Sequence, residues 1–274
     1  MSNMPPPTRH IIFKRARGSR RLRPQRPATE KHVYIALALD TALDLLSTRT
    51  AKTAMAMITR LFDDNLPVHL QIFRDISDAG ITFSIDRFVE IMQMQTPLII
   101  IDGNLTDPGN PAYHHRETWT GNFNPLEQRI ILNKELVEDM VDAAESRKVF
   151  RRFQFQFVNV FFHEIGGHLL FTYLYHGLPS TPRQVMPPTW SGQEGGRVGE
   201  SGRTLEAVVS TPWIVDDNNN ARRVTRQTID DTITHRTDFS VPYATVGPEI
   251  SVSQLLALQR QVDATRAPMG SPER

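Results

Sequence analysis

An α+β fold is predicted by three features of the sequence. Two aliphatic runs, LIIID at 98–102 and RIILN at 129–133, have the length and composition of buried strands. Segments rich in Ala, Leu and Met, with apolar residues three and four apart, are typical of amphipathic helices. The mostly apolar run from 153 to 176, which stops at Gly177, predicts a central helix buried on nearly all sides.

Each element is expected at a definite place along the chain. Residues 32–64 form one or two helices, 67–73 a short strand, 84–94 a helix capped by Ser84, 98–102 a strand, 105–122 a polar loop, 129–133 a strand, 134–146 a helix capped by Asn133, and 200–209 and 251–262 further helices. The stretch FQFQF at 153–157 alternates like a strand, but the length of the apolar run favours a helix.

These elements predict one domain over residues 31–265. An α/β lobe extends to about residue 176, a mostly helical lobe follows it, and residues 266–274 form a flexible end. The first 29 residues hold eight Lys and Arg and no acid, although the whole chain has a formal net charge of only +1. Such a segment has few apolar groups to bury, so residues 1–30 are predicted to form a disordered basic tail.

The composition limits both location and chemistry. No apolar stretch reaches the roughly 18 residues that a membrane-spanning helix needs. An intracellular protein, cytoplasmic or nuclear, is expected; a mitochondrial leader is the alternative, although prolines interrupt an amphipathic helix in the tail. Nucleic acid is expected to meet the protein only through a weak contact with this tail. Because the chain has no cysteine, any metal must be held by nitrogen and oxygen.

The segment FFHEIGGHLLF at 161–171 carries the motif that points to chemistry. A histidine pair beside a glutamate, here His163, His168 and Glu164, is how zinc hydrolases hold the metal and activate water. The spacing of five residues would separate the rings by about 140° on a regular α-helix, too far to share an ion. A π-helical turn absorbs the extra residue, and the two glycines before His168 lower its steric cost. We therefore predict a widened turn that brings both imidazoles to one side.

This string resembles the HExxGH motif of the dipeptidyl peptidase III family of zinc exopeptidases. The matching positions are His163, Glu164, Gly167 and His168, and the resemblance does not extend to the rest of the chain. It implies a zincin-like fold, with a small sheet and a central active-site helix before the C-terminal lobe. It also implies Zn²⁺ as the cofactor, His163 and His168 as metal ligands, and Glu164 as the general base.

A later glutamate is implied as the third zinc ligand. Glu200 is similar to the glutamate followed by small residues that has this role in thermolysin-like and aminopeptidase-type zincins, and Glu206 is the alternative. Without a metal, Glu200 is simply an acid that favours a helix N-terminus, and Glu206 a solvated residue. The strand over 129–133 resembles the edge strand along which small zincins bind a peptide.

A zinc metallopeptidase that cleaves a peptide or protein substrate with zinc-activated water is therefore the expected function. One alternative makes His163 and His168 core histidines bonded to backbone carbonyls, with Glu164 paired to an arginine such as Arg203. Another is a non-catalytic zincin-like binding or scaffold protein whose basic tail contacts an acidic partner.

Other polar residues carry weaker signals. His114 and His115 are adjacent, so their side chains point apart, and they are expected to lie in the polar loop. Asp102 ends a strand but has no partner at the spacing that a second metal requires. An oxyanion donor is expected to be one of five residues: Tyr173, Tyr175, His176, His235 and Tyr243.

Overall fold

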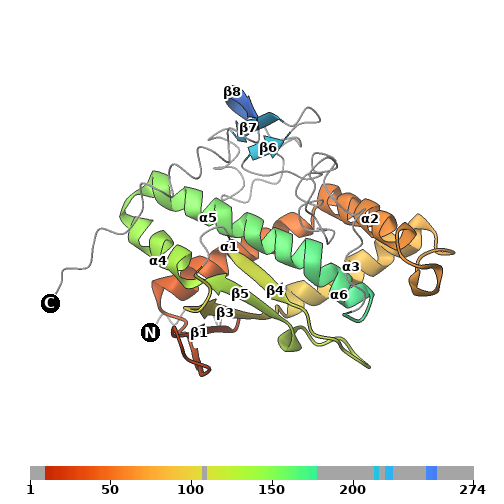
Figure 1. Cartoon of the computed structure of the whole chain (residues 1–274), viewed down its shortest axis with the longest axis horizontal. Coiled ribbons are helices and arrows are strands. Elements are labelled where there is room, and N and C mark those ends of the chain that lie inside the picture. The colour runs from red at the N-terminus through yellow and green to blue at the C-terminus, as the bar shows by residue number, and fades with distance from the viewer. Residues whose placement is uncertain (1–9, 107–109, 178–212, 216–219, 225–244, 252–274) are drawn as a thin grey trace, which may run out of the picture.

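A five-stranded mixed sheet organises the part of the chain that holds the motif. The computed structural model describes residues 10–106, 110–177, 213–215, 220–224 and 245–251. The strands of this sheet are β1 (Ile12–Arg15), β2 (Leu22–Pro24), β3 (Leu98–Asp102), β4 (Ala112–His115) and β5 (Arg129–Asn133). Their spatial order is β2-β1-β3-β5-β4, with β1, β3 and β5 parallel and the outer two antiparallel to their neighbours. Helices pack along the sheet (Figure 1), and the α+β class is confirmed.

The helices begin where capping side chains are available. They are α1 (Glu30–Leu46), α2 (Arg49–Asp64), α3 (Asp78–Met94), α4 (Lys134–Asp142), α5 (Arg147–Phe161) and α6 (Leu170–Leu174), with 3-10 turns η1 (Val68–Leu70), η2 (Pro125–Glu127) and η3 (Ala143–Glu145). Thr29, Thr48, Ser77 and Asn133 each accept a hydrogen bond from a backbone N–H of the following turn. The predicted Asn133 cap and the two helices within 32–64 are confirmed.

Two predictions between α2 and β3 are wrong. Ser84 lies inside α3, where its hydroxyl donates to the carbonyl of Gly80 at 3.1 Å, because Ser77 caps the helix earlier. Residues 67–73 are not a strand. The backbone N–H groups of Ile72 and Phe73 donate to the carboxylate of Asp63, at 2.9 and 3.1 Å, in place of a strand ladder.

The basic N-terminal segment belongs to the sheet. β1 pairs in parallel with β3 along its whole length, and β2 pairs with β1. Ile12 is buried in the core, and Arg15 makes an ion pair with the buried Asp102. The prediction of a disordered tail is therefore wrong for β1 and β2, because these two anchors hold β1 in the sheet despite the basic composition around it.

The edge strand lies inside the predicted polar loop. β5 is paired on both sides, so the prediction that residues 129–133 form the edge is wrong, and β4 takes that place. Ala112 and His114 are buried, whereas Tyr113 and His115 are exposed. The sequence does not reveal this strand because only two of its four residues face the core, and only one of those two, Ala112, is apolar.

The predicted central helix is confirmed. α5, a π-helical segment η4 (Phe162–Leu169) and α6 follow one another without a break, and the FQFQF stretch lies within α5. Phe171 of α6 stacks on Phe62 of α2 with ring centroids 4.2 Å apart. Gly177 ends the helix at φ +83°, and a Cβ there would lie 2.8 Å from Cα of Thr118, so no other residue fits without a shift.

A second sheet follows in the C-terminal part of the chain. It contains β6 (Trp213–Val215), β7 (Asn220–Val224) and β8 (Thr245–Ser251), antiparallel in that order. Beyond residue 177 the described residues belong to these three strands, and the rest of the predicted helical lobe lies outside the described residues. Around DDNNN at 216–220 the sequence has turn-favouring residues between two runs of strand-favouring residues. This pattern is typical of a β-hairpin. The helix over 200–209 lies outside the described residues, as does 252–262 of the last one.

Candidate metal centre

A π-helical turn brings His163 and His168 onto one side of the central helix. η4 contains both histidines, Glu164 and the glycine pair. The two imidazole ring centroids lie 4.9 Å apart. On a regular α-helix residues five apart are separated by about 140°, so this proximity depends on the π geometry. The predicted widened turn is confirmed.

The three side chains form one group of metal-ligating atoms. One such atom from each of His163, Glu164 and His168 lies within 4.8 Å of the other two. Ligand atoms around a tetrahedral zinc ion stand roughly 3.5 Å apart, so small side-chain rotations would suffice to close the group on an ion. The arrangement is compatible with a motif of the HExxxH type, and two imidazoles with one carboxylate are donors that can hold a metal.

The carboxylate of Glu164 is held by the edge strand. Glu164 is 4% exposed, and its Oε2 accepts a hydrogen bond from the backbone N–H of His114 at 2.8 Å. The same oxygen lies 3.4 Å from Nδ1 of His168. Burial raises the pKa of Glu164, but the hydrogen bond with His168 and the charges of the surrounding histidines outweigh it, so the pKa lies below its usual range. Glu164 is therefore ionised at neutral pH.

His114 also lies at this site. The sequence does not indicate this, because His114 stands in a polar segment that predicts a loop. Its side chain is buried, and its Nε2 lies 3.2 Å from Oε1 of Gln128. That oxygen also accepts from the backbone N–H of Glu117, which identifies it as an acceptor, so Nε2 of His114 carries the proton. Burial, with the nearby charge of His168, lowers the pKa of His114 to about 4. The imidazole is neutral at pH 7.

His168 is the most exposed member of the metal-ligating group. The side chain of His168 is 24% exposed, whereas that of Glu164 is 6% exposed. His114 directs its backbone N–H away from β5 and towards Glu164, so the outer edge of β4 borders the group. His168 and the outer edge of β4 therefore lie on either side of the Glu164 carboxylate.

The other predicted site residues fall into two sets. Tyr175 is buried and donates to Asp63 at 2.8 Å, and burial and this bond both raise its pKa, so it is a structural donor. His176 stacks on Trp119 with ring centroids 4.0 Å apart, and Tyr173 lies beside the same indole. The remaining candidates lie outside the described residues: Glu200, Arg203, Glu206, His235 and Tyr243.

Comparisons with known proteins add no family to this picture. No family model, no curated protein and no solved structure matches the chain. The resemblance to zincins therefore rests on the string from His163 to His168 and on its geometry. Among the described helices, none combines the length and apolar character that a membrane crossing requires.

Proposed function

We propose that the protein is a zinc-dependent hydrolase, specifically a metallopeptidase. The observation that supports this most directly is the convergence of His163, Glu164 and His168 on one side of a π-helical turn. A helix interior pays a conformational penalty of roughly 1 kcal/mol for each glycine, so a glycine pair that serves only packing is an unfavourable choice. A bound zinc ion would supply Lewis acidity, which polarises a carbonyl and lowers the pKa of water to about 7.

Glu164 is assigned the role of general base. Its carboxylate is ionised and is fixed by the backbone N–H of His114, so one oxygen is anchored while the group remains able to accept a proton. The proton taken from the attacking water would pass to the leaving amine. His163 and His168 would hold the metal through neutral imidazole nitrogens.

A third metal ligand completes this proposal. Glu200 is the first candidate and Glu206 the second, and both lie outside the described residues. Three protein ligands leave one position open, which is what a catalytic zinc site needs and a structural site does not have. Loss of zinc affinity should be larger for Glu200→Ala than for Glu206→Ala.

The substrate is proposed to lie along β4. An edge strand presents backbone N–H and C=O groups on its outer side. In β4 the outward N–H of His114 is taken by Glu164, so a peptide in extended form would pair with the outward groups that remain. Because β4 is the edge next to Glu164, a peptide bound there would have its backbone beside the carboxylate. The position of this edge favours a peptide over another amide.

Metal content tests the proposal. Purified wild-type protein should carry about one zinc per chain, and His163→Ala should lower this at least about tenfold. The matched control is His69→Ala, since His69 is exposed in η1 and lies outside the metal-ligating group. Plasma mass spectrometry on both variants gives the answer. Full zinc occupancy in His163→Ala would remove the site from consideration.

A metal-free scaffold protein is the second candidate, and one observation favours it. The Glu164 carboxylate already has a backbone donor and an imidazole within reach, so the cluster is satisfied as a structural group without an ion. In that case neither wild type nor His163→Ala would bind stoichiometric zinc. The variant would differ from wild type only in its free energy of unfolding.

A further inference from the structure

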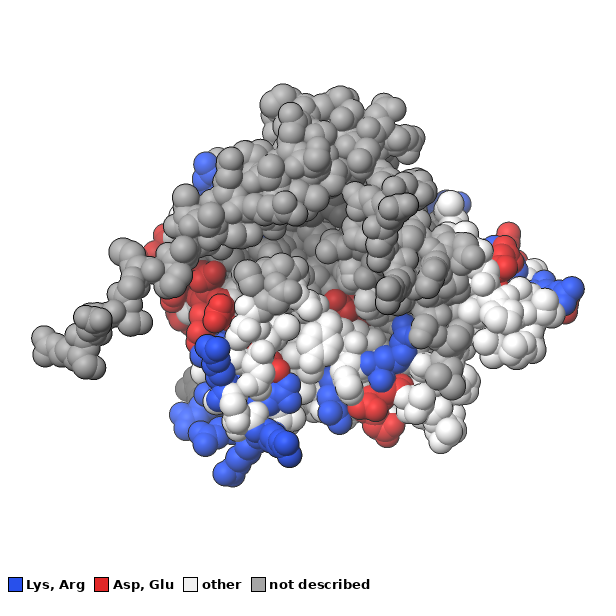
Figure 2. Space-filling view, in the orientation of Figure 1, with Lys and Arg blue, Asp and Glu red and all other residues white. Residues whose placement is uncertain are grey.

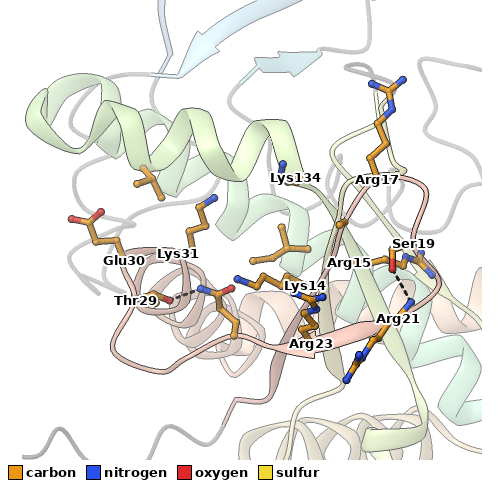
Figure 3. A pocket seen from close by; sticks show the side chains of 14 residues that line it. Lys14, Arg15, Arg17, Ser19, Arg21, Arg23, Thr29, Glu30, Lys31 and Lys134 are labelled. Carbon is orange, nitrogen blue, oxygen red and sulfur yellow. Dashed lines mark hydrogen bonds between the residues drawn. The ribbon is translucent and has the colours of Figure 1, made fainter.

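A basic pocket lies at the edge of the sheet opposite to the metal-ligating group. The β1–β2 hairpin, the first turn of α1 and helix α4 surround it, and its volume is about 540 Å³. Lys and Arg side chains gather over this part of the molecule (Figure 2). Seven of its 14 lining residues are Lys or Arg, and one, Glu30, is acidic (Figure 3). The pocket therefore carries an excess of positive charge.

Three of these cations make ion pairs with two neighbouring acids. Arg15 pairs with Asp102. Lys31 and Lys134 both pair with Glu138, at 2.6 and 3.4 Å. The other four lie on β1, on β2 and in the turn between them, are exposed, and make no ion pair with any acid in the described parts of the chain: Lys14, Arg17, Arg21 and Arg23. A ligand with several negative charges would offset them.

The strand register places two of these cations directly opposite each other. Lys14 on β1 pairs with Arg23 on β2, and on its other side with Ile101 on β3. Partners in a register share one face of the sheet, so both cations stand on the face where Ile101 is buried. Like charges directly opposite each other in an antiparallel pair are destabilising. An anion between Lys14 and Arg23 would remove this repulsion.

The pocket also lies where open parallel sheets bind ligands. β1, β3 and β5 are parallel, and Arg15, Ile101 and Lys134 lie at or just beyond their carboxyl ends. Ligands of such sheets bind in the crevice outside these ends. A volume of about 540 Å³ is within the range of roughly 300–1,000 Å³ that small-molecule sites occupy. Size and position thus favour a small molecule over a polymer that would extend beyond the pocket.

We propose that this pocket binds a small organic polyphosphate. Guanidinium groups bind phosphate oxygens in pairs, and the four unneutralised cations match the charge of a chain of about three phosphates. The aliphatic side chains of Ile101 and Val141 provide an apolar wall for the organic part of the ligand. The site is separate from the metal-ligating group by three strand spacings, about 14 Å in all, and does not depend on the proposed peptidase activity.

Calorimetric titration of the full chain with inorganic tripolyphosphate, in a buffer of low ionic strength, tests the proposal. Wild type should bind one tripolyphosphate, and Arg23→Glu should weaken the affinity at least about tenfold. The matched control is Arg74→Glu, which changes the net charge equally at an exposed position between α2 and α3, and should change the affinity less than about twofold.

The fold of the test variant can be checked independently. Arg23→Glu replaces a like-charge contact with Lys14 by an attractive one, so its melting temperature should be equal to or above that of wild type. Absence of tripolyphosphate binding, or an equal loss in both variants, would overturn the proposal. Citrate bound as tightly as tripolyphosphate would overturn the preference for phosphate. Affinity for single-stranded oligonucleotides that exceeds that for tripolyphosphate and rises with length would make the site a nucleic-acid surface instead.

Discussion

Asp63 and Glu164 are both buried carboxylates, but the protein surrounds them with different partners. Asp63 is fully buried at the end of α2 and accepts three hydrogen bonds, from the hydroxyl of Tyr175 and from the backbone N–H groups of Ile72 and Phe73. Glu164 has one backbone donor, and its other neighbours are imidazoles.

The difference lies in what the partners can do. The three donors to Asp63 are neutral, two of them are backbone amides, and together they join the segment after α2 to the end of the central helix. The imidazoles beside Glu164 can bind a metal or exchange a proton. Burial alone therefore does not distinguish the two acids, whereas the chemistry of their neighbours does. Four predictions test this distinction.

Insertion of one alanine between Gly167 and His168 should affect both carboxylates and have the largest effect. The π turn already absorbs one extra residue, so a second one moves the histidines out of reach of a shared zinc ion and rotates the chain after them by about 100°. Phe171 and Tyr175 would leave their places against Phe62 and Asp63, so we expect at least about 4 kcal/mol less stability in urea unfolding. Combined with Asp63→Ala, the loss should be less than additive. Full additivity would mean that Tyr175 still reaches Asp63.

Asp63→Ala should reduce the free energy of unfolding by about 3 kcal/mol or more. Three donors lose their buried acceptor, and each unsatisfied donor costs about 1–3 kcal/mol. Urea unfolding measures the loss, and zinc per folded molecule should not change. A loss below about 1 kcal/mol would show that water replaces the carboxylate as the acceptor. Asp63 would then not be what holds the segment after α2 to the central helix.

Glu164→Gln should separate catalysis from stability. The amide oxygen can still accept from His114, so the free energy of unfolding should change by less than about 1 kcal/mol. Hydrolysis of a mixed peptide library, followed by mass spectrometry, should fall at least about 100-fold while zinc is retained. Loss of zinc from this variant would instead make Glu164 a metal ligand, and unchanged hydrolysis would exclude it as the base.

Tyr175→Phe should give the smallest effect. It removes one of three donors to Asp63 and leaves the two backbone N–H groups in place, so about 1 kcal/mol of stability should be lost. Zinc content and peptide hydrolysis should equal those of wild type. A fall in hydrolysis at equal zinc content would instead indicate that the Tyr175 hydroxyl stabilises the oxyanion.

The features that could be predicted from sequence are those with a local cause. The spacing of His163 and His168 and the glycines between them are enough to predict the π turn, because helix geometry alone decides whether the rings meet. The aliphatic strands and the central helix follow from the same kind of local pattern. Of the five strands in this sheet, the sequence therefore predicts β3 and β5.

The features that were missed depend on distant partners. β4 becomes a strand because His114 meets Gln128 and Glu164, which lie 14 and 50 residues further along the chain. β1 is ordered because Arg15 meets Asp102, which is 87 residues away. No local pattern contains these pairings, and the basic composition around β1 actively suggests disorder.

The parallel pairing of β1 with β3 also has a consequence for synthesis of the chain. Ile12 pairs with Ile99, so β1 leaves the ribosome long before the strand that it will join. At about 5–20 residues per second, the delay is roughly 4–17 s. During this time the strand has only β2 as a neighbour, and a two-stranded hairpin is marginally stable in water. Repulsion among its arginines would oppose pairing of this hairpin with the same segment of other nascent chains.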